Sequence, residues 1–224
     1  MDTVESNLEL IKIISLSKNF GNNIVLDNVN LHYAAGRIYG IVGENGAGKT
    51  TFFNCLVGLL DFEGDIIKAS GIQIGYLPAE NYFYPLITGM EYLEFCLKAK
   101  KISKTSVEIE AINRAFFNLP LYRYASEYST GMKKKLAFMA LFLQNNDLYI
   151  LDEPFNGVDL KGCILLKQLI VDLKQQGKTI LISSHLITML HELCDSIDYL
   201  YNHTIKKRYV NETVEEIEFD ILNF

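Results

Sequence analysis

Short apolar segments, evenly spaced and separated by polar turns, predict a chain in which strands alternate with helices. Period-two patterns at 8–16 and 24–31 predict two strands joined through the turn-rich stretch 19–23. Further apolar runs are short enough to be strands buried on both faces of a parallel sheet, and they lie at 37–42, 72–77, 148–151 and 179–183. A helix is predicted at 50–60, after a glycine-rich loop.

The stretch 82–145 has a different pattern. It is mostly helical in its periodicity, rich in lysine, glutamate, leucine and aromatic residues, and broken by Pro85 and Pro120. We therefore predict an α/β core into which a helical lobe is inserted. The whole chain, 1–224, is then one domain, in which 1–81 and 146–224 form the core lobe and 82–145 forms the helical lobe.

Composition narrows the possible classes of protein. With 224 residues, 49% of them hydrophobic, the chain is large enough to bury one sizeable core. Its net charge of −6 argues against a protein whose main ligand is nucleic acid, because neutralisation of phosphates supplies most of that affinity. The four cysteines are scattered without a close pair, which favours the reducing cytosol over a disulfide framework or a zinc site.

The apolar runs are all shorter than the roughly 18–20 residues that a helix needs to cross a bilayer. The first residues carry acids where a signal peptide carries positive charge. We therefore expect a cytoplasmic protein, and any role that it has at a membrane must come through a partner.

A phosphate-binding loop is the clearest chemical motif. Residues 43–50, Gly-Glu-Asn-Gly-Ala-Gly-Lys-Thr, match G-x-x-x-x-G-K-[ST], with a predicted strand before and a predicted helix after. Glycines let the backbone turn so that several N–H groups converge on one anion, and the helix N-terminus adds about half a positive charge. Lys49 can reach the β- and γ-phosphates, and the Thr50 hydroxyl can hold Mg²⁺.

The candidate nucleotide-binding residues of this loop are Gly43, Asn45, Gly46, Ala47, Gly48, Lys49, Thr50 and Thr51. A glycine-rich turn that binds nothing is the alternative, and the Lys-Thr ending disfavours it. The motif by itself fits a GTPase, a kinase or a helicase equally well.

Two adjacent acids end the apolar run at 148–151. Asp152 stands where a carboxylate can bind Mg²⁺ beside the phosphate loop, and Glu153 stands where a carboxylate can orient or deprotonate an attacking water. Pro154 ends the strand at the edge of the sheet where open α/β sheets bind their ligands. A solvated acidic turn is the alternative, and the phosphate loop upstream favours the catalytic role.

Four further features occur in the order found in the ABC ATPase family, which the chain resembles over nearly its whole length. Residues 128–132, Tyr-Ser-Thr-Gly-Met, are similar to the family signature, and residues 156–159, Asn-Gly-Val-Asp, to its aspartate loop. His185 follows an apolar strand where the family has its switch histidine. Phe20 stands where the family has an aromatic ring that stacks on adenine, although a ring beside a turn can also cap a core.

The resemblance implies a P-loop NTPase fold of the RecA-like type, with a mostly parallel core, an N-terminal antiparallel β subdomain and an inserted helical lobe. It implies ATP and Mg²⁺ as cofactors and ATP hydrolysis as the reaction, with Glu153 and His185 as catalytic residues. Two copies, or one copy and a related ATPase subunit, would hold two ATP molecules head to tail. Ser129, Gly131 and Asp159 would then contribute to the nucleotide site, with Ser129 and Gly131 facing the γ-phosphate held by the second copy.

Within the family, the chain resembles ATP-binding subunits of export-type transporters, which act with an integral-membrane permease on a separate chain and lie on the inner face of the cell membrane. Two alternatives stay open. One is a soluble ATPase of the same family that works in cluster assembly without a permease. The other is a regulatory module that binds ATP with little turnover.

Two departures from the family pattern affect the expected chemistry. Ala79 occupies the position of a glutamine that contacts Mg²⁺ in the family, so we expect weaker placement of the ion, with Glu80 as a possible substitute. Thr130 replaces the first glycine of the signature, and a β-branched residue disfavours positive φ, so we expect a slower site. Ser129 also precedes the predicted helix 132–143 and can cap it.

For the remaining residues of interest, an ordinary structural role is the main alternative to a functional one. The run Lys133–Lys135 is interpreted as a solvated helix face near the phosphates. The aromatic run 82–84 lies where the family docks a permease helix, and burial in the helical lobe is equally compatible with it. His32, His191 and His203 are expected at the surface.

Overall fold

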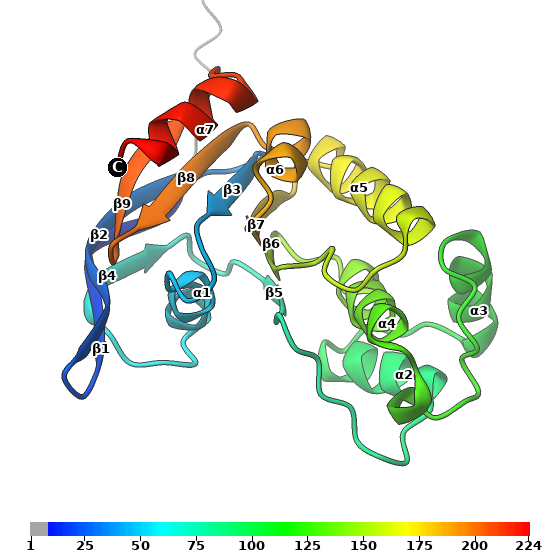
Figure 1. Ribbon diagram of the computed structural model, residues 1–224. Coiled ribbons are helices and arrows are strands. Elements are labelled where there is room, and N and C mark those ends of the chain that lie inside the picture. Colours follow the sequence, from blue (N-terminus) through cyan, green and yellow to red (C-terminus); the bar gives the residue numbers. More distant parts are fainter. Residues whose placement is uncertain (1–8) are drawn as a thin grey trace, which may run out of the picture.

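The computed structural model describes residues 9–224 (Figure 1). Leu8, with which the first predicted strand begins, and the acidic start at 1–7 lie outside the described residues. Two sheets and the helices around them make up the fold. An antiparallel sheet has the order β2-β1-β4, and a six-stranded sheet has the order β5-β6-β7-β3-β8-β9.

The antiparallel sheet is built on the predicted N-terminal hairpin. Strands β1 (Glu9–Phe20) and β2 (Asn23–Ala34) pair around a tight turn that contains Gly21, and β4 (Glu63–Lys68), which the apolar pattern did not reveal, pairs with the other edge of β1. The predicted antiparallel subdomain is therefore confirmed, with one additional strand.

The larger sheet contains the predicted apolar strands. Its parallel members are β3 (Ile38–Val42), β5 (Ile74–Leu77), β6 (Leu148–Asp152), β7 (Thr179–Ser184) and β8 (Ser196–Tyr201), and β9 (Thr204–Tyr209) pairs antiparallel to β8 at the edge. The carboxyl ends of β3 and β6 therefore lie at one edge of the sheet, because both are parallel to β7 between them.

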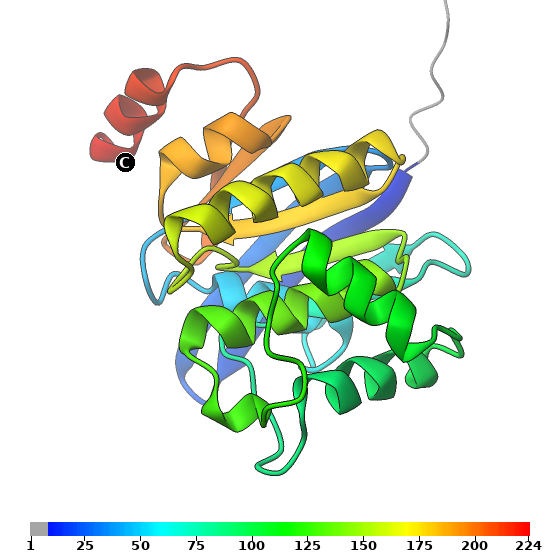
Figure 2. The same ribbon diagram turned by 90° about the vertical axis from the view of Figure 1, so that its right-hand side faces the viewer.

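Helices cover both faces of this sheet, which explains why its strands are almost continuously apolar. Helix α1 (Lys49–Val57) lies between the two sheets, where Phe52 and Phe53 pack with Ile11, Ile41 and Ile150. The other face packs against α4 (Thr130–Leu143), α5 (Leu160–Gln175) and α6 (Ile187–Leu193). In Figure 2, α4 and α5 lie in front of the strands.

The chain between β5 and β6 is helical, as predicted. It contains α2 (Gly89–Ala99), α3 (Ser106–Ala115), the 3₁₀ turn η1 (Ala125–Glu127) and α4. Figure 1 shows α2, α3 and α4 on the side of the molecule away from the antiparallel sheet. Capping boxes at Thr88–Glu91 and Thr105–Glu108 fix the starts of α2 and α3. The division into residues 82–145 and two flanking segments remains a prediction.

A buried ion pair joins the C-terminal strand to both sheets. Asp198 on β8 is fully buried, and its Oδ1 accepts from the Nε of Arg208 on β9 at 2.7 Å. Arg208 also donates to the backbone carbonyl of His32 on β2, and the hydroxyl of Tyr33 donates to Asp198 at 3.2 Å. The last helix, α7 (Val214–Leu222), follows this strand. Among the helices described, none combines the length and apolar character needed to span a membrane.

Candidate functional site

The loop from Gly43 to Gly48 connects β3 to α1, as the motif predicted. A Cβ at Gly43 would lie 2.5 Å from the carbonyl oxygen of Leu200, so only glycine fits there. Gly46 and Gly48 have φ values of 86° and 108°, which place both in a region that favours glycine. Glycine is therefore needed here for two separate reasons. Gly43 closely approaches β8, and Gly46 and Gly48 form the turn into α1.

The turn leaves backbone donors available to an anion. Within residues 9–224, no hydrogen bond uses the N–H groups of Gly46, Gly48 or Lys49, which lie at the start of α1. The helix N-terminus contributes partial positive charge at the same place. Lys49 is buried, and its ammonium lies across the loop, donating to the carbonyls of Gly43 at 2.7 Å and Glu44 at 3.1 Å. These features suit a phosphate group.

Asp152 lies at the end of β6, close to the start of α1. Its carboxylate is fully buried, and its Oδ2 accepts from the Thr50 hydroxyl at 2.5 Å. Its Oδ1 accepts from the Ser183 hydroxyl on the neighbouring strand β7, which itself accepts from the Glu153 N–H at 2.9 Å. Ser183 therefore aligns both acids, a role that only the pairing of β6 with β7 reveals.

Glu153 has the most unusual geometry in the site. Its φ of +46° is uncommon for a residue with a side chain, and such strain costs about 1–3 kcal/mol where it occurs. Its buried Oε1 has no hydrogen-bond partner and lies 3.5 Å from the Lys49 ammonium. Its Oε2 lies 3.1 Å from Nδ1 of His185, whose side chain is 37% exposed. The structure thus brings together Lys49, Asp152, Glu153 and His185.

The oxygen atoms at this edge also fit a Mg²⁺ ion. Within the described part of the chain, no group of three or more His, Cys, Asp and Glu side chains could hold a metal by itself. Mg²⁺ does not need one, because it takes one or two protein oxygens together with phosphate oxygens and water. Thr50 and Asp152 offer two suitable oxygens side by side, and the unpartnered Oε1 of Glu153 is an acceptor for a water.

The signature segment lies at the start of α4. Ser129 is its N-cap, accepting from the Met132 N–H at 3.3 Å, so the capping role is confirmed. A Cβ at Gly131 would overlap the carbonyl oxygen of Gly157, so α4 begins in direct contact with the predicted aspartate loop. The slower site that we expect from Thr130 stays a prediction. Thr130 is the first residue of the helix and is absent from the residues with positive φ, so its side chain is accommodated.

The signature and the phosphate loop do not meet within one chain. Ser129 is exposed, and no hydrogen bond or ion pair among residues 9–224 joins Ser129 or Gly131 to residues 43–50. If both segments act on the same phosphate, the two must come from different molecules.

The lysine run is not the solvated face that we predicted. Lys134 is only 2% exposed, and its ammonium donates to the carbonyls of Ala79 at 2.7 Å and Glu153 at 2.9 Å. Lys135 forms an ion pair with Asp159, and this interaction lowers the pKa of that carboxyl. The interpretation failed because α4 packs against the sheet and the two loops, so that polar positions on it also face protein.

Phe20 and the aromatic run 82–84 differ in how far their side chains are exposed. Phe20 is 48% exposed at the end of β1, with the Lys18 ammonium 5.0 Å from the centre of its ring, so it does not cap the core. Stacking on adenine stays a prediction. Tyr82 and Tyr84 are exposed, whereas Phe83 is buried against Tyr92. His32 and His191 are exposed, and His203 is half-buried.

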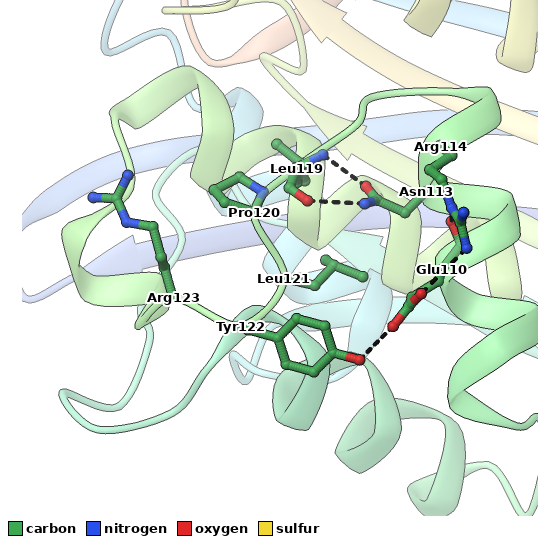
Figure 3. Close-up of a pocket in the computed structure, with 8 residues that line it drawn as sticks. All are labelled: Glu110, Asn113, Arg114, Leu119, Pro120, Leu121, Tyr122 and Arg123. Carbon is green, nitrogen blue, oxygen red and sulfur yellow. Dashed lines mark hydrogen bonds and ion pairs between the residues drawn. The ribbon is translucent and has the colours of Figure 1, made fainter.

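A separate pocket of about 480 Å³ lies on the helical segment (Figure 3). Its wall is formed by the end of α3 and the loop 119–123, and the Asn113 amide holds that loop by hydrogen bonds to both the N–H and the carbonyl of Leu119. Tyr122 donates to Glu110 across the opening. The pocket contains none of the predicted site residues, and its Asn113 amide and Glu110 carboxylate are used in hydrogen bonds to the loop.

Comparisons with known proteins agree on one family. A family model described as ABC transporter matches residues 26–156, more than half of the chain. An uncharacterised ABC transporter ATP-binding protein of Methanocaldococcus jannaschii is 35% identical over 84% of this chain and 72% of its own. A lantibiotic transport ATP-binding protein of Streptococcus pyogenes is 30% identical, with 93% of this chain and 95% of that protein covered. A solved ATP-binding subunit of an ABC transporter superposes with a TM-score of 0.82 at 28% identity, covering 95% of this chain and 93% of that one.

Proposed function

This chain belongs to the ABC transporter family as an ATP-binding subunit, an ATPase that energises transport, and from this premise we propose that two copies close head to tail around two ATP molecules to drive a permease on a separate chain. One observation carries the proposal. The phosphate loop lies beside Glu153, whereas Ser129 of the signature is exposed and forms no hydrogen bond or ion pair with that loop among the described residues.

The triphosphate binds over the N-terminus of α1. The N–H groups of Gly46, Gly48 and Lys49 donate hydrogen bonds to phosphate oxygens, and the Lys49 ammonium exchanges its loop carbonyls for the β- and γ-phosphates. The remaining loop residues and Thr51 shape this cradle, and the exposed ring of Phe20 stacks on the adenine. The Thr50 hydroxyl and the Asp152 carboxylate would hold Mg²⁺, which would neutralise phosphate charge there.

Glu153 acts as the general base. Its Oε1 has no partner of its own, so it can accept a hydrogen bond from the attacking water, and His185 orients the carboxylate through the other oxygen and contacts the γ-phosphate. Ser129 and Gly131 of the second copy approach the γ-phosphate from the other side, with Asp159 beside them, because a helix start with an exposed hydroxyl that can still donate a hydrogen bond suits an anion.

Hydrolysis should require Mg²⁺, so removing the ion with a chelator should abolish phosphate release by the wild-type chain. Ala79 has no side-chain atom that can hold a cation or a water. We therefore expect Ala79→Gln to lower the Mg²⁺ concentration for half-maximal hydrolysis several-fold, which a Mg²⁺ titration of phosphate release measures. Identical titration curves for the variant and the wild type would show that Ala79 does not affect the ion.

The permease contacts the segment after β5, where Tyr82 is 77% exposed and Tyr84 is 66% exposed. Through it, the subunit lies on the inner face of the membrane. The double variant Tyr82→Ser/Tyr84→Ser should hydrolyse ATP at the wild-type rate within about twofold but fail to co-purify with its permease from detergent-solubilised membranes. The matched control is Tyr122→Ser/Tyr124→Ser, two exposed tyrosines on the same part of the chain. Equal recovery of permease with both double variants would contradict this placement.

A further inference from the structure

Lys134 is a buried charge with two well-defined partners. Its side chain comes from the second turn of α4, and its ammonium reaches the carbonyl of Ala79 at 2.7 Å and the carbonyl of Glu153 at 2.9 Å. An ammonium has three donors and no acceptor, so it can bridge two carbonyls that cannot bond each other. The bridge joins the segments that follow β5 and β6 to a helix that lies between these strands in the sequence.

The two carbonyls lie in backbone segments beyond the last paired residues of the sheet. Pairing between β5 and β6 ends at Leu77–Leu151, and pairing between β6 and β7 ends at Asp152–Ser183. Glu153 therefore follows the last paired residue and has the positive φ described above. Its N–H is held by the Ser183 hydroxyl and its carbonyl by Lys134, so two side chains fix the peptide units on either side of the catalytic residue.

A purely structural role explains this arrangement less well. The neighbouring buried positions of α4 are apolar, for example Leu136 and Phe138, and an unbranched apolar side chain would fill the same volume without a charge. Burial lowers the pKa of the Lys134 ammonium, whereas the carboxylates of Asp152, Glu153 and Glu80 raise it. Lys134 is therefore placed where desolvation opposes its charge, and its ammonium contacts the backbone of Ala79 and Glu153.

We propose that Lys134 is a positioning residue that links the backbone at Ala79 to the backbone at Glu153, so that a displacement of the segment 79–84 changes the position of the Glu153 carboxylate. This inference rests on the proposed function, in which 82–84 contacts the permease and Glu153 is the base. Because Ala79 has no polar side-chain atom, its carbonyl is the group through which the segment is held. The link runs in both directions, so ATP bound beside Glu153 also restrains the segment that contacts the permease.

The test compares Lys134→Met, which keeps an unbranched side chain one atom shorter and without donors, with Lys133→Met, which removes a lysine whose ammonium has no hydrogen bond or ion pair among the described residues. We expect Lys134→Met to lower kcat by about 10- to 100-fold, because misplacing a reacting group by about an ångström has an effect of this size. The Kd for ATP should stay within about twofold, since the phosphate loop is untouched. Lys133→Met should leave both values unchanged.

Hydrogen exchange supplies a readout that a loss of packing alone would not produce. In the wild type, Mg-ATP should slow exchange across residues 79–84, and in Lys134→Met the bound nucleotide should no longer do so. Lys134→Arg retains donors and should recover part of both kcat and the ATP-dependent protection, and it replaces Lys134→Met if the latter does not fold. An unchanged kcat, or the same ATP-dependent protection in Lys134→Met as in the wild type, would overturn the proposal. Failure of the wild-type chain to bind or hydrolyse ATP would instead contradict the proposed function.

Discussion

Replacing Glu153 with glutamine should lower the kcat of ATP hydrolysis by about 100-fold or more, while the Kd for ATP changes by less than about twofold. Glutamine keeps the size of the side chain and the contact with His185, but its amide cannot take a proton from water. The carboxylate oxygen that faces the phosphate loop is buried and has no hydrogen-bond partner, so it can accept a hydrogen bond from the attacking water. Steady-state phosphate release and a nucleotide titration measure the two effects.

The matched control is Glu218→Gln, an exposed carboxylate on α7 that should leave kcat unchanged. A Glu153→Gln chain that hydrolyses ATP as fast as the wild type would exclude Glu153 as the base. A wild-type chain that binds ATP without turnover would favour the regulatory module.

The same variant reports on the assembly. Since Glu153→Gln should bind ATP without consuming it, its mass in solution should double when Mg-ATP is added, as two identical chains trap two nucleotides between phosphate loop and signature. A variant that binds ATP and stays monomeric would show that the second half-site comes from another ATPase chain or requires the permease.

Replacing Lys49 with alanine should weaken ATP binding by about 100-fold or more, and hydrolysis should fall with it. Charge-assisted hydrogen bonds contribute about 1.5–3 kcal/mol each, and every 1.4 kcal/mol is a tenfold change in Kd. The Lys49 ammonium donates to two loop carbonyls and lies near Glu153, so it is at the place where we propose that the triphosphate binds.

Isothermal titration calorimetry with ATP measures this loss, and the Lys98→Ala chain, which changes an exposed lysine on α2, is the control. The Lys49→Ala chain should melt within a few degrees of the wild type. Wild-type affinity in this variant would mean that the backbone donors of the loop suffice and that the lysine acts elsewhere.

The parts of the site that could be predicted are those encoded within a few neighbouring residues. The loop 43–50 and the pair Asp152–Glu153 carry their chemistry in local spacing, and the apolar strands around them are continuous because helices cover both faces. Ser183 and Lys134 could not be found in this way. Each acts through a contact between segments distant in sequence, and such contacts follow from packing rather than from a local pattern.

Strand β9 could not be predicted from its local pattern for the same reason. Strand β9 contains Lys206, Lys207 and Arg208 in succession, so it lacks the apolar pattern of the other strands. Arg208 is nevertheless only partly exposed, because it is paired with Asp198 and bonded to β2. The contact with its buried partner Asp198 becomes apparent only once the sheet is formed.

That ion pair has a consequence for how the protein can change over generations. Asp198 is fully buried and its counter-charge comes from a different strand, so losing either partner alone leaves a charge without compensation inside the molecule. A change that removes both charges together should therefore be tolerated better than the loss of either one alone. Substitutions at Asp198 and Arg208 are expected to be coupled in this way although β9 lies at the edge of the sheet.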